Sequence, residues 1–284
     1  MPELPEVEIT ARLISEAARG RTITKVRVPG LNAVKTFDPP MDSLATEQIA
    51  GVRRRGKHLI VDTAGGLSLL IHLMSAGRLQ LYDKPASMRD RTARVLLELD
   101  DGRELRLREF GTRQRAWAKL VRTGELESDE AISRLGPEAW PESPADLRER
   151  LAAEGARPLY SVLRDQHVIT GIGRSWVDEI LWTAKLSPFS RGADLSEADA
   201  DGLRAAIAGR LGGAIAHYEH VLALPLPDKL PLPLEIHRKN GEPCPRCGTT
   251  IEAVHFEDYV LCYCPQCQTG GKVFKDRRLS RLLR

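Results

Sequence analysis

The sequence has no long hydrophobic run, no internal repeat and no segment typical of a secretory leader. No apolar stretch in its 284 residues approaches the roughly 18 residues that span a bilayer, which excludes a membrane-spanning helix. The first residues, Met-Pro-Glu-Leu-Pro-Glu-Val-Glu, are acidic and lack the basic end and apolar stretch of a secretory signal. We therefore expect a cytoplasmic protein with no membrane partner.

Excess charge of either sign is also small. The chain has 42 Lys and Arg against 39 Asp and Glu, a formal net charge of +3, which alone does not indicate a nucleic-acid partner. With 42% hydrophobic and 29% charged residues, the composition is typical of a soluble globular protein. It excludes a disordered chain, a collagen-like chain and a disulfide scaffold. The length predicts two domains, or two domains and a small appendage.

The placement of the charges is more informative than their sum. Four of the five residues from Arg53 to Lys57 are cations, and seven Lys or Arg against two Glu lie between Arg103 and Arg122. The acids concentrate at Glu125–Glu154 and Asp194–Asp201. Such segregation can produce a basic face on a nearly neutral protein. The alternative is that solvated arginines are scattered over the whole surface.

Hydrophobic periodicity predicts an N-terminal helix followed by a β-sandwich or barrel. Leu4, Val7 and Ile14 lie on one side of a helix over residues 4–19, and Gly20 ends the pattern. Seven short runs separated by turn residues are then typical of strands: 22–28, 58–62, 67–73, 78–82, 93–99, 104–108 and 114–121.

The character of the chain changes after a proline-containing stretch at 136–144. Residues 145–220 favour helices, four prolines recur between Pro225 and Pro233, and all five cysteines lie in the last 50 residues. We therefore predict a multidomain α+β protein. Its parts are an N-terminal β-sandwich with a helix (1–130), a helical domain (145–224) and a cysteine-containing hairpin (235–284).

Two CxxC pairs indicate a metal site. Cys244 and Cys247 form one pair and Cys264 and Cys267 the other, and two such turns give the closed tetrahedral Cys₄ environment that zinc takes in structural sites. We predict one structural Zn²⁺, with a redox function of the CxxC pairs as the alternative. Cys262 is left over, and we expect a buried cysteine that does not bind the metal. The alternative is that it replaces Cys264 as a ligand, since the two lie on the same face of an extended segment.

Four features together resemble the formamidopyrimidine-DNA glycosylase/endonuclease VIII family. They are the initial octapeptide, Lys57 after three arginines and a glycine, the segment Gly171-Ile172-Gly173, and the two terminal CxxC pairs. They occur in the family's order and at about its usual spacing, and the start is closer to the formamidopyrimidine branch. The resemblance implies a sandwich, a helix–two-turn–helix (H2TH) domain and a zinc hairpin that bind DNA.

The resemblance implies that Pro2 is the nucleophile. Once Met1 is removed, Pro2 has a terminal secondary amine, whose ordinary pKa of about 8 leaves a neutral fraction at physiological pH. Attack on C1′ of a damaged nucleotide expels the base and leaves a cationic iminium, which permits strand cleavage by β-elimination. Glu3 would act as acid and base, and Glu6 would face the same pocket and hold the helix start. Lys57 would contact phosphate beside the lesion and assist catalysis, the alternative being a solvated loop lysine.

The resemblance also implies DNA contacts in two places. The H2TH motif should span about Pro158–Trp182, with phosphate bound by Gly173 and Arg174 at the N-terminus of a helix over Ser175–Ala184. The residues that fill the duplex after a base is extruded correspond to Met74, Arg108 and Phe110. For Phe110, a place in the core is the alternative.

The chain departs from the family's pattern at several of these places. Arg174 stands where the pattern has Asn, and Glu257-Asp258-Tyr259 is acidic where the zinc hairpin carries an Arg. Glu109 replaces a usual Arg, and Met74 comes one residue early. The segment from Gly212-Gly213 to Tyr218 matches poorly the Gly- and Thr-rich segment that caps oxidised guanine, so the preferred lesion need not be 8-oxoguanine.

We interpret the chain as a bifunctional DNA glycosylase and apurinic/apyrimidinic (AP) lyase of base-excision repair. Its expected partner is double-stranded DNA with a damaged base or an abasic site, and we expect a monomer. One alternative is a binding protein of the same fold that recognises damaged or abasic DNA with weak or no turnover. Another is a zinc-ribbon scaffold that does not bind DNA. Lesion preference, opposite-base preference and the choice between β- and β,δ-elimination do not follow from the sequence.

Overall fold

The computed structural model of the chain describes residues 2–87, 89–111, 114–257 and 259–274. Its contacts divide the chain into two compact units. The first unit comprises Met1–Arg134 and Ile215–Pro231, and the second comprises Leu135–Ala214 and Leu232–Arg284. The second unit thus contains both the helical segment and the cysteine-rich segment, and the three domain boundaries drawn from the sequence stay a prediction.

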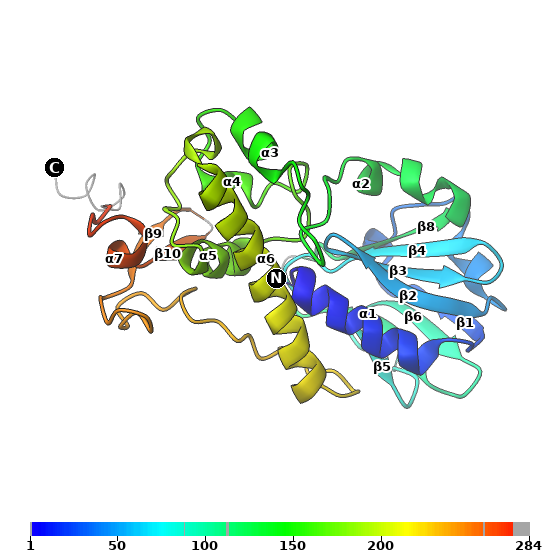
Figure 1. Cartoon of the computed structure of the whole chain (residues 1–284). Helices are drawn as coiled ribbons and strands as arrows, with labels where there is room; N and C mark the ends of the chain where they lie inside the picture. The colour runs from blue at the N-terminus through cyan, green and yellow to red at the C-terminus, as the bar shows by residue number, and fades with distance from the viewer. Residues whose placement is uncertain (1, 88, 112–113, 258, 275–284) are drawn as a thin grey trace. The chain divides into compact units, whose positions relative to one another are not determined.

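The first unit is built on two antiparallel four-stranded sheets (Figure 1). One sheet has the order β1 (Ile23–Arg27), β6 (Ala93–Leu99), β7 (Glu104–Glu109) and β5 (Gly77–Tyr82). The other has the order β2 (Ile49–Arg55), β3 (His58–Thr63), β4 (Leu67–His72) and β8 (Trp117–Arg122). Alternate apolar side chains of both sheets share one buried core, for example Leu59, Ile71, Leu97 and Leu105. The predicted β-sandwich is confirmed.

Strand β2 is absent from the seven strands that the sequence predicted. Its residues Ile49 and Val52 are buried, but Arg53, Arg54 and Arg55 follow them. The three arginines hide the alternation of apolar and polar residues that identifies a half-buried strand. Strand β2 pairs with β3 in register from Arg55 opposite His58, so the basic run forms one arm of a hairpin.

Helix α1 (Leu4–Ala18) confirms the predicted N-terminal helix. Its apolar side, including Leu4, Val7 and Ile14, is fully buried, and the helix lies along β2 (Figure 1). Gly20 follows with φ +79°, a left-handed conformation that glycine adopts without steric cost. The other elements of this unit are η1 (Leu31–Ala33), η2 (Met41–Leu44), η3 (Thr123–Ser128), α2 (Glu130–Ser133) and the last residues of α6 (Glu197–Val221).

The second unit contains the helices predicted between 145 and 220 and the cysteine hairpin. Its elements are α3 (Leu147–Ala153), α4 (Leu159–Val162), α5 (Arg174–Thr183), η4 (Gly192–Asp194), the first part of α6, β9 (Glu252–His255), β10 (Val260–Tyr263) and α7 (Pro265–Gln268). Helix α5 begins one residue before the predicted start and carries the buried side chains of Trp176, Val177 and Ile180. Strands β9 and β10 form an antiparallel pair.

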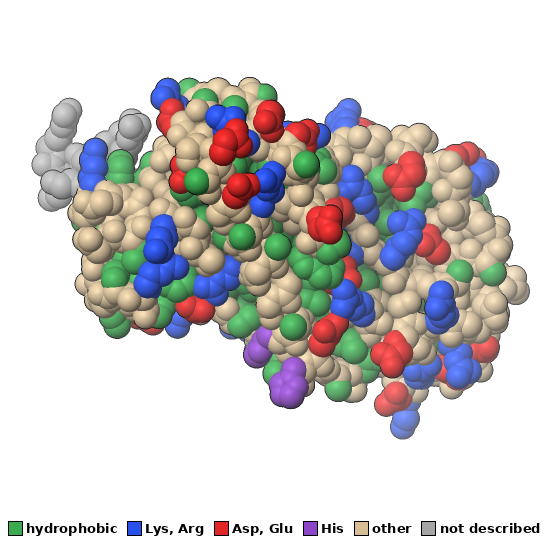
Figure 2. Space-filling view, in the orientation of Figure 1, with side chains coloured by type: hydrophobic (Ala, Val, Ile, Leu, Met, Phe, Trp, Pro, Cys, Tyr) green, Lys and Arg blue, Asp and Glu red, His purple; other side chains and the backbone are tan. Residues whose placement is uncertain are grey.

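The surface charge and the helix composition bear on the predicted basic face and on a membrane crossing. On the face drawn in Figure 2, cationic and anionic side chains are intermingled, and the predicted basic face stays a prediction. Of the helices in the part of the chain that the structure describes, none has both the length and the apolar character that a membrane crossing needs.

Candidate active site and zinc site

The start of helix α1 brings Pro2, Glu3 and Glu6 together. Glu3 is the N-cap, and its backbone N–H donates a 2.8 Å hydrogen bond to Oε2 of Glu6. The Val7 N–H donates to the Glu3 carbonyl at 2.9 Å. Glu3 and Glu6 are both buried. A carboxylate that caps the first turn is favourable because it accepts an unsatisfied N–H and lies at the positive end of the helix dipole. The sequence around Glu6 therefore fixes the backbone that carries Pro2.

Tyr218, near the end of α6 and within the first unit, completes this cluster. Its hydroxyl donates a 2.8 Å hydrogen bond to Oε1 of Glu6, and the tyrosine is fully buried. Burial, followed by the negative charge of Glu6, raises the pKa of Tyr218 well above its usual range, so the phenol remains a donor. This role could not be predicted from the sequence, because Tyr218 lies 212 positions from Glu6 and matches no local motif.

A small cavity in the first unit opens beside Pro2. Pro2, Glu6 and Thr10 line it from α1, Arg78 and Gln80 from β5, and Leu226 and Leu230 from the proline-rich segment after α6. The Thr10 hydroxyl donates to the Glu6 carbonyl at 2.7 Å. The lining therefore combines polar side chains of α1 and β5 with apolar side chains of the proline-rich segment.

The proline-rich segment is tied to strand β5. Nε2 of Gln80 donates to the Leu226 carbonyl at 2.8 Å and to Oδ1 of Asp228 at 3.0 Å. Nε of Arg78 donates to the Asp228 carbonyl at 2.6 Å. Burial lowers the pKa of Arg78, although the carboxylates of Asp228 and Glu6 act in the opposite direction. From the sequence, residues 225–233 are recognisable only by their four prolines, whereas in the structure Leu226, Pro227 and Leu230 lie beside Pro2.

Lys57 lies in the turn between β2 and β3 and is only 8% exposed. The alternative of a solvated loop lysine is therefore wrong. Gly56 precedes it with φ +56°, which shapes the turn. Next to Lys57, Nε of Arg54 pairs with Oε2 of Glu8 at 2.9 Å, which ties this hairpin to α1.

Two histidines are paired across strands β3 and β4 beside Lys57, the buried His58 and the partly buried His72. The rings of His58 and His72 are 4.7 Å apart, and Trp117 stacks on His72 at 5.9 Å. Burial lowers the pKa of His58 to about 4 and of His72 to about 3, and the neighbouring positive charge of Lys57 adds to both effects. Both rings are thus neutral at physiological pH. Nδ1 of His72 accepts the N–H of Met74 at 3.0 Å, and Met74 has the left-handed φ of +49°.

Arg108 and Phe110 form a pair at the end of strand β7. The Arg108 guanidinium lies over the Phe110 ring at 4.6 Å, and Phe110 is 41% exposed. A core position for Phe110 is therefore excluded. Nε of Arg108 donates to Oγ1 of Thr92 at 2.9 Å, and Nη1 lies 3.6 Å from Oδ1 of Asp228.

Glu109 accepts hydrogen bonds from the backbone of the segment that follows β7. Its Oε1 accepts the backbone N–H groups of Arg115 at 2.7 Å and of Ala116 at 3.0 Å, and the side chain is buried. The acid that replaces a usual Arg in the family's pattern thus closes the loop between β7 and β8 from inside.

Gly173 and Arg174 form the start of helix α5 in the second unit. Gly173 is the N-cap, and Gly171 in the preceding turn has φ +105°. Oε1 of Gln166 accepts the Gly171 N–H at 3.0 Å, and its Nε2 donates to the Ile172 carbonyl at 2.9 Å. One side chain therefore holds both sides of the turn.

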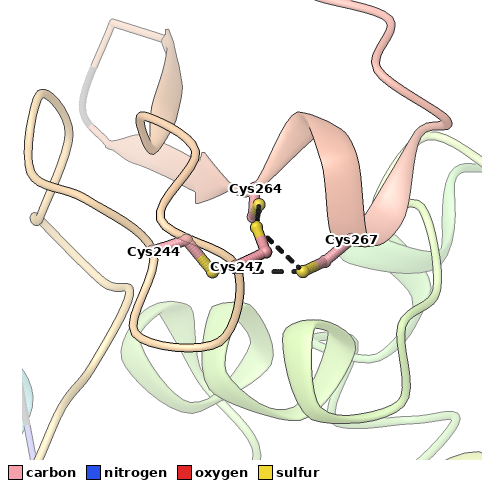
Figure 3. Close-up of side chains that lie close together, drawn as sticks. All are labelled: Cys244, Cys247, Cys264 and Cys267. Atoms are coloured by element: carbon pink, nitrogen blue, oxygen red, sulfur yellow. Dashed lines mark hydrogen bonds between the residues drawn. The ribbon is translucent and has the colours of Figure 1, made fainter.

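The four cysteines converge at one point (Figure 3). Their Sγ atoms all lie within 4.8 Å of one another, with Cys247 to Cys264 at 3.4 Å and Cys244 to Cys267 at 4.0 Å. Zinc–sulfur bonds of about 2.3 Å in a tetrahedron place sulfur atoms about 3.8 Å apart. The donor set and its spacing therefore fit one structural zinc, and the prediction is confirmed. Four thiolates leave no coordination position for water, so the metal holds the hairpin together.

Cys262 lies outside this set of ligands, as expected. It is buried, its sulfur accepts the Arg238 N–H at 3.3 Å, and burial raises the pKa of its thiol to about 11.

Two adjacent carboxylates of α5 hold the segment of chain that leads to the first CxxC pair. Oδ2 of Asp178 lies 2.7 Å from Nδ1 of His237, and Oε1 of Glu179 accepts three backbone N–H groups from residues 235–237.

Three family models match successive parts of the chain. The formamidopyrimidine-DNA glycosylase N-terminal domain matches residues 1–114. The formamidopyrimidine-DNA glycosylase H2TH domain matches residues 135–223. A zinc finger found in FPG and IleRS matches residues 241–270. Together these matches cover most of the chain in the order that the sequence resemblance implied.

Known proteins resemble the chain over nearly its whole length or over about half of it. A formamidopyrimidine-DNA glycosylase of Latilactobacillus sakei is 32% identical over 94% of this chain and 98% of the relative. An uncharacterized formamidopyrimidine-DNA glycosylase-like protein of Mycobacterium tuberculosis is 43% identical over 53% of this chain and 94% of the relative.

A solved structure shows the same fold. It is a complex of Lactococcus lactis Fpg with DNA that contains N7-benzyl-Fapy-dG, and it superposes with a TM-score of 0.84 at 26% identity. The match covers 94% of this chain and all of that one. A second structure of the same Fpg, bound to DNA with an abasic site, gives a TM-score of 0.83. The chain therefore belongs to the formamidopyrimidine-DNA glycosylase family.

Proposed function

We propose that this protein is a bifunctional enzyme of base-excision repair. It excises damaged bases from double-stranded DNA and cleaves the strand at the resulting abasic site. The single observation that carries this proposal is the Pro2 cluster, in which a residue with a reactive N-terminal amine precedes a helix start held by buried Glu3, Glu6 and Tyr218. Relatives named for this glycosylase activity support it.

The Pro2 nitrogen forms a bond to C1′ of the damaged nucleotide while the bond from C1′ to the base breaks. The base leaves with the electron pair and takes up a proton, for which Glu3 is the adjacent acid. The attacking nitrogen gives up its N–H proton, and C1′ is then bonded to both this nitrogen and the ring oxygen O4′. Protonation of O4′, for which Glu3 is again the adjacent acid, breaks the C1′–O4′ bond and opens the sugar. The product is a cationic iminium, because the attacking amine is secondary. Loss of a proton from C2′ gives an enamine, which expels the 3′ phosphate and cleaves the strand.

Three groups of the first unit suit this chemistry. Arg78 lines the same cavity, and a nearby cation disfavours protonation of an amine, which keeps more of the nucleophile neutral. The Glu6 carboxylate, which accepts from Glu3 N–H and from Tyr218, orients the first turn. Lys57 is the cation proposed to contact phosphate beside the lesion.

The DNA contacts belong to the same proposal. Gly173 and Arg174 would bind phosphate at the N-terminus of α5, since a helix start presents N–H groups to an anion. Exposed Phe110, with Arg108 beside it, would fill the space that an extruded base leaves. Met74 lies in the turn between β4 and β5 and would contribute to this filling. We further propose that the protein acts as a monomer in the cytoplasm.

Borohydride trapping tests the lyase step. A duplex with an abasic site should form a covalent adduct with the protein that has a free Pro2, because borohydride reduces the iminium to a stable amine. A matched protein with one additional residue before Pro2 should form no adduct, since its Pro2 nitrogen is an amide. Absence of an adduct with the free Pro2 would end the lyase proposal.

A second candidate function is recognition of damaged DNA with little turnover. The observation that favours it is the proline-rich segment, whose ties to Arg78 and Gln80 occupy side chains that line the Pro2 cavity. This candidate predicts tight binding to a duplex with an abasic analogue, together with trapping no greater than that of a Pro2→Gly variant. Rapid strand cleavage would exclude it.

A further inference from the structure

The second unit contains a compact stack of aromatic rings and arginines. The rings of Phe256 and Tyr259 are 4.4 Å apart and nearly parallel, and the rings of Tyr259 and Tyr160 are 5.7 Å apart with 16° between their planes. Cζ of Arg164 lies 4.4 Å from the centre of the Tyr160 ring and 4.5 Å from that of Tyr259. Cζ of Arg174 lies 5.1 Å from the centre of the Tyr259 ring. Tyr259 thus contacts both guanidinium groups.

The members of this stack come from three separate segments. Tyr160 belongs to α4 with Arg164 just after it, Arg174 is the first residue of α5, and Phe256 and Tyr259 flank the turn between β9 and β10. The Phe256 N–H donates to the Tyr259 carbonyl at 2.8 Å and closes that turn. The turn of the zinc hairpin therefore supplies the ring on which the arginines of the helical segment rest.

This arrangement bears on the acidic hairpin turn. The family's pattern has a phosphate-binding Arg in the hairpin, whereas this chain has exposed Glu257 there. The structure places two cations next to the same turn, Arg164 from the residues that follow α4 and Arg174 from the start of α5. A cation therefore stands at the helix start, at Arg174, and the hairpin stretch in which the family's pattern has its Arg contributes the ring of Tyr259 beside it.

A guanidinium that rests on a ring suits an oxyanion ligand. The contact with the ring uses the face of the group, and the N–H groups on its edge are the ones that pair with phosphate oxygens. In Arg164, Nε donates to the Tyr160 carbonyl at 3.2 Å, which also fixes this side chain beside the ring. Arg174 and Arg164 are partly exposed, and Phe256 is 39% exposed. Arg174 also begins the ten-residue helix α5 behind an N-cap glycine, so its charge adds to the positive end of that helix.

We propose that Arg174 and Arg164, held in place by Tyr259, form a phosphodiester-binding site that replaces a cation of the zinc hairpin. The ligand is the DNA backbone, and Tyr259 is a positioning residue that acts through the arginines. This inference rests on the proposed function, because it assumes a DNA substrate. It adds Arg164 and Tyr259 to the binding surface and gives the residue exchange at Arg174 a physical purpose.

The test is a binding series at several salt concentrations. The full-length zinc-loaded protein is titrated with a duplex that contains an uncleavable abasic analogue, and affinity is followed by fluorescence anisotropy. Removal of one phosphate contact lowers the slope of log K against log salt by about 0.9. We expect this loss for Arg174→Ala and for Arg164→Ala, with at least a fivefold weaker Kd at low salt. The control is Arg191→Ala, since Arg191 is an exposed arginine of the same unit that pairs with Asp194; its slope should not change.

Tyr259 is tested through coupling. Tyr259→Leu should weaken binding severalfold in the wild-type background but much less in the Arg164→Ala/Arg174→Ala background, because no guanidinium then needs the ring. Tyr259→Phe keeps the ring and should bind as the wild type does. Additive effects of Tyr259→Leu in the two backgrounds, or unchanged salt slopes for both arginine variants, would overturn the inference. Zinc content and melting temperature are measured for each variant, so that a damaged hairpin is not mistaken for a lost contact.

Borohydride trapping separates this inference from the proposed function. Normal trapping with unchanged salt slopes contradicts the arginine site alone. Reduced slopes without trapping support the site and contradict the lyase.

Discussion

The Pro2 cluster of the first unit and the zinc site of the second unit are assembled over very different distances along the chain. Cys244 and Cys267 are only 23 positions apart, and both CxxC pairs lie within one hairpin. In the Pro2 cluster, Glu6 is held on one side by its neighbour Glu3 and on the other by Tyr218, 212 positions away. The zinc site is a local structure, whereas the Pro2 cluster depends on how the unit folds around it.

This difference also sets how each site can fail. The folded structure of the zinc hairpin depends on the metal. Its two strands have four residues each and bury too little apolar surface to be stable alone. The Pro2 cluster depends on buried hydrogen bonds to a carboxylate, each of which contributes a modest amount but leaves a costly unsatisfied group when removed. Loss of zinc should thus disorder one region, whereas loss of one hydrogen bond should misplace one nucleophile.

Removal of zinc should have the largest effect. Structural zinc contributes about 10–16 kcal/mol to the folding of small zinc domains at neutral pH. We expect a strong chelator to accelerate hydrogen exchange in β9, β10 and the CxxC loops, while the sheets of the first unit retain their protection. Hydrogen exchange read by mass spectrometry measures this directly.

The matched pair for this prediction is Cys264→Ser and Cys262→Ser. The first variant should lose its zinc and the second should keep one zinc per chain, because Cys262 lies outside the ligand set. Loss of zinc from Cys262→Ser, or equal exchange in both units after chelation, would contradict the assignment of a local, metal-dependent structure.

Tyr218→Phe should have the next largest effect, on turnover. The variant keeps the ring in the core and removes one hydrogen bond to a buried carboxylate, worth about 1.5–3 kcal/mol. If this energy holds Pro2 in place, kcat for cleavage at an abasic site should fall roughly 10- to 100-fold, since 1.36 kcal/mol corresponds to a factor of ten. KM for the duplex should change little. Single-turnover kinetics measure both.

Tyr263→Phe is the control for this substitution. Tyr263 is also fully buried, and its hydroxyl accepts the Phe274 N–H at 2.8 Å, but it lies in the second unit. Its loss should lower stability without lowering kcat. Equal kcat values for Tyr218→Phe and the wild type would show that Pro2 is held by the local contacts of α1 alone.

The same contrast explains what the sequence could predict. Helix α1, six of the sandwich strands at nearly their observed bounds and the four zinc ligands depend on local periodicity or spacing, and all were predicted. Strand β2 was missed because Arg53, Arg54 and Arg55 obscure its alternation.

Contacts between segments that are distant along the chain could not be predicted from a single sequence. The hydrogen bond of Tyr218, the ties of the proline-rich segment to Gln80 and the place of Arg174 on Tyr259 all join residues that are distant along the chain. The family resemblance implied Pro2, Glu3 and Lys57, but it could not reveal partners at which this chain departs from the family's pattern. Those partners depend on tertiary packing, which only the structure supplies.

Acid sensitivity should sharpen the comparison of the two units. Native His58 and His72 have lowered pKa values of about 4 and about 3, whereas in the unfolded chain a histidine titrates at about 6.5. Between these values the unfolded state binds more protons, so the free energy of unfolding falls as the pH is lowered from about 6.5 toward 4. Each histidine contributes up to about 1.4 kcal/mol per pH unit in this range.

His72→Asn tests this pH dependence. The amide oxygen can still accept the Met74 N–H, but the side chain no longer titrates, so the variant should lose less stability than the wild type between pH 6.5 and 4.5. Urea denaturation of the zinc-loaded protein, followed by a probe in the first unit, gives the two slopes. Parallel slopes would mean that the histidines remain accessible to protons in the native state.

The smallest expected effect concerns the backbone at Met74. Its φ of +49° is left-handed, a conformation that costs a residue with a side chain about 1–2 kcal/mol and costs glycine almost nothing. In most positions Met→Gly is more destabilising than Met→Ala, because glycine gains more freedom in the unfolded chain. At Met74 the order should be reversed, with Met74→Gly more stable than Met74→Ala by about 1 kcal/mol in chemical denaturation. Met74→Ala is the control for Met74→Gly, since both substitutions remove the side chain beyond Cβ. The usual order would show that the turn relaxes when the side chain is lost, and that the hydrogen bond from Met74 to His72 does not fix its conformation.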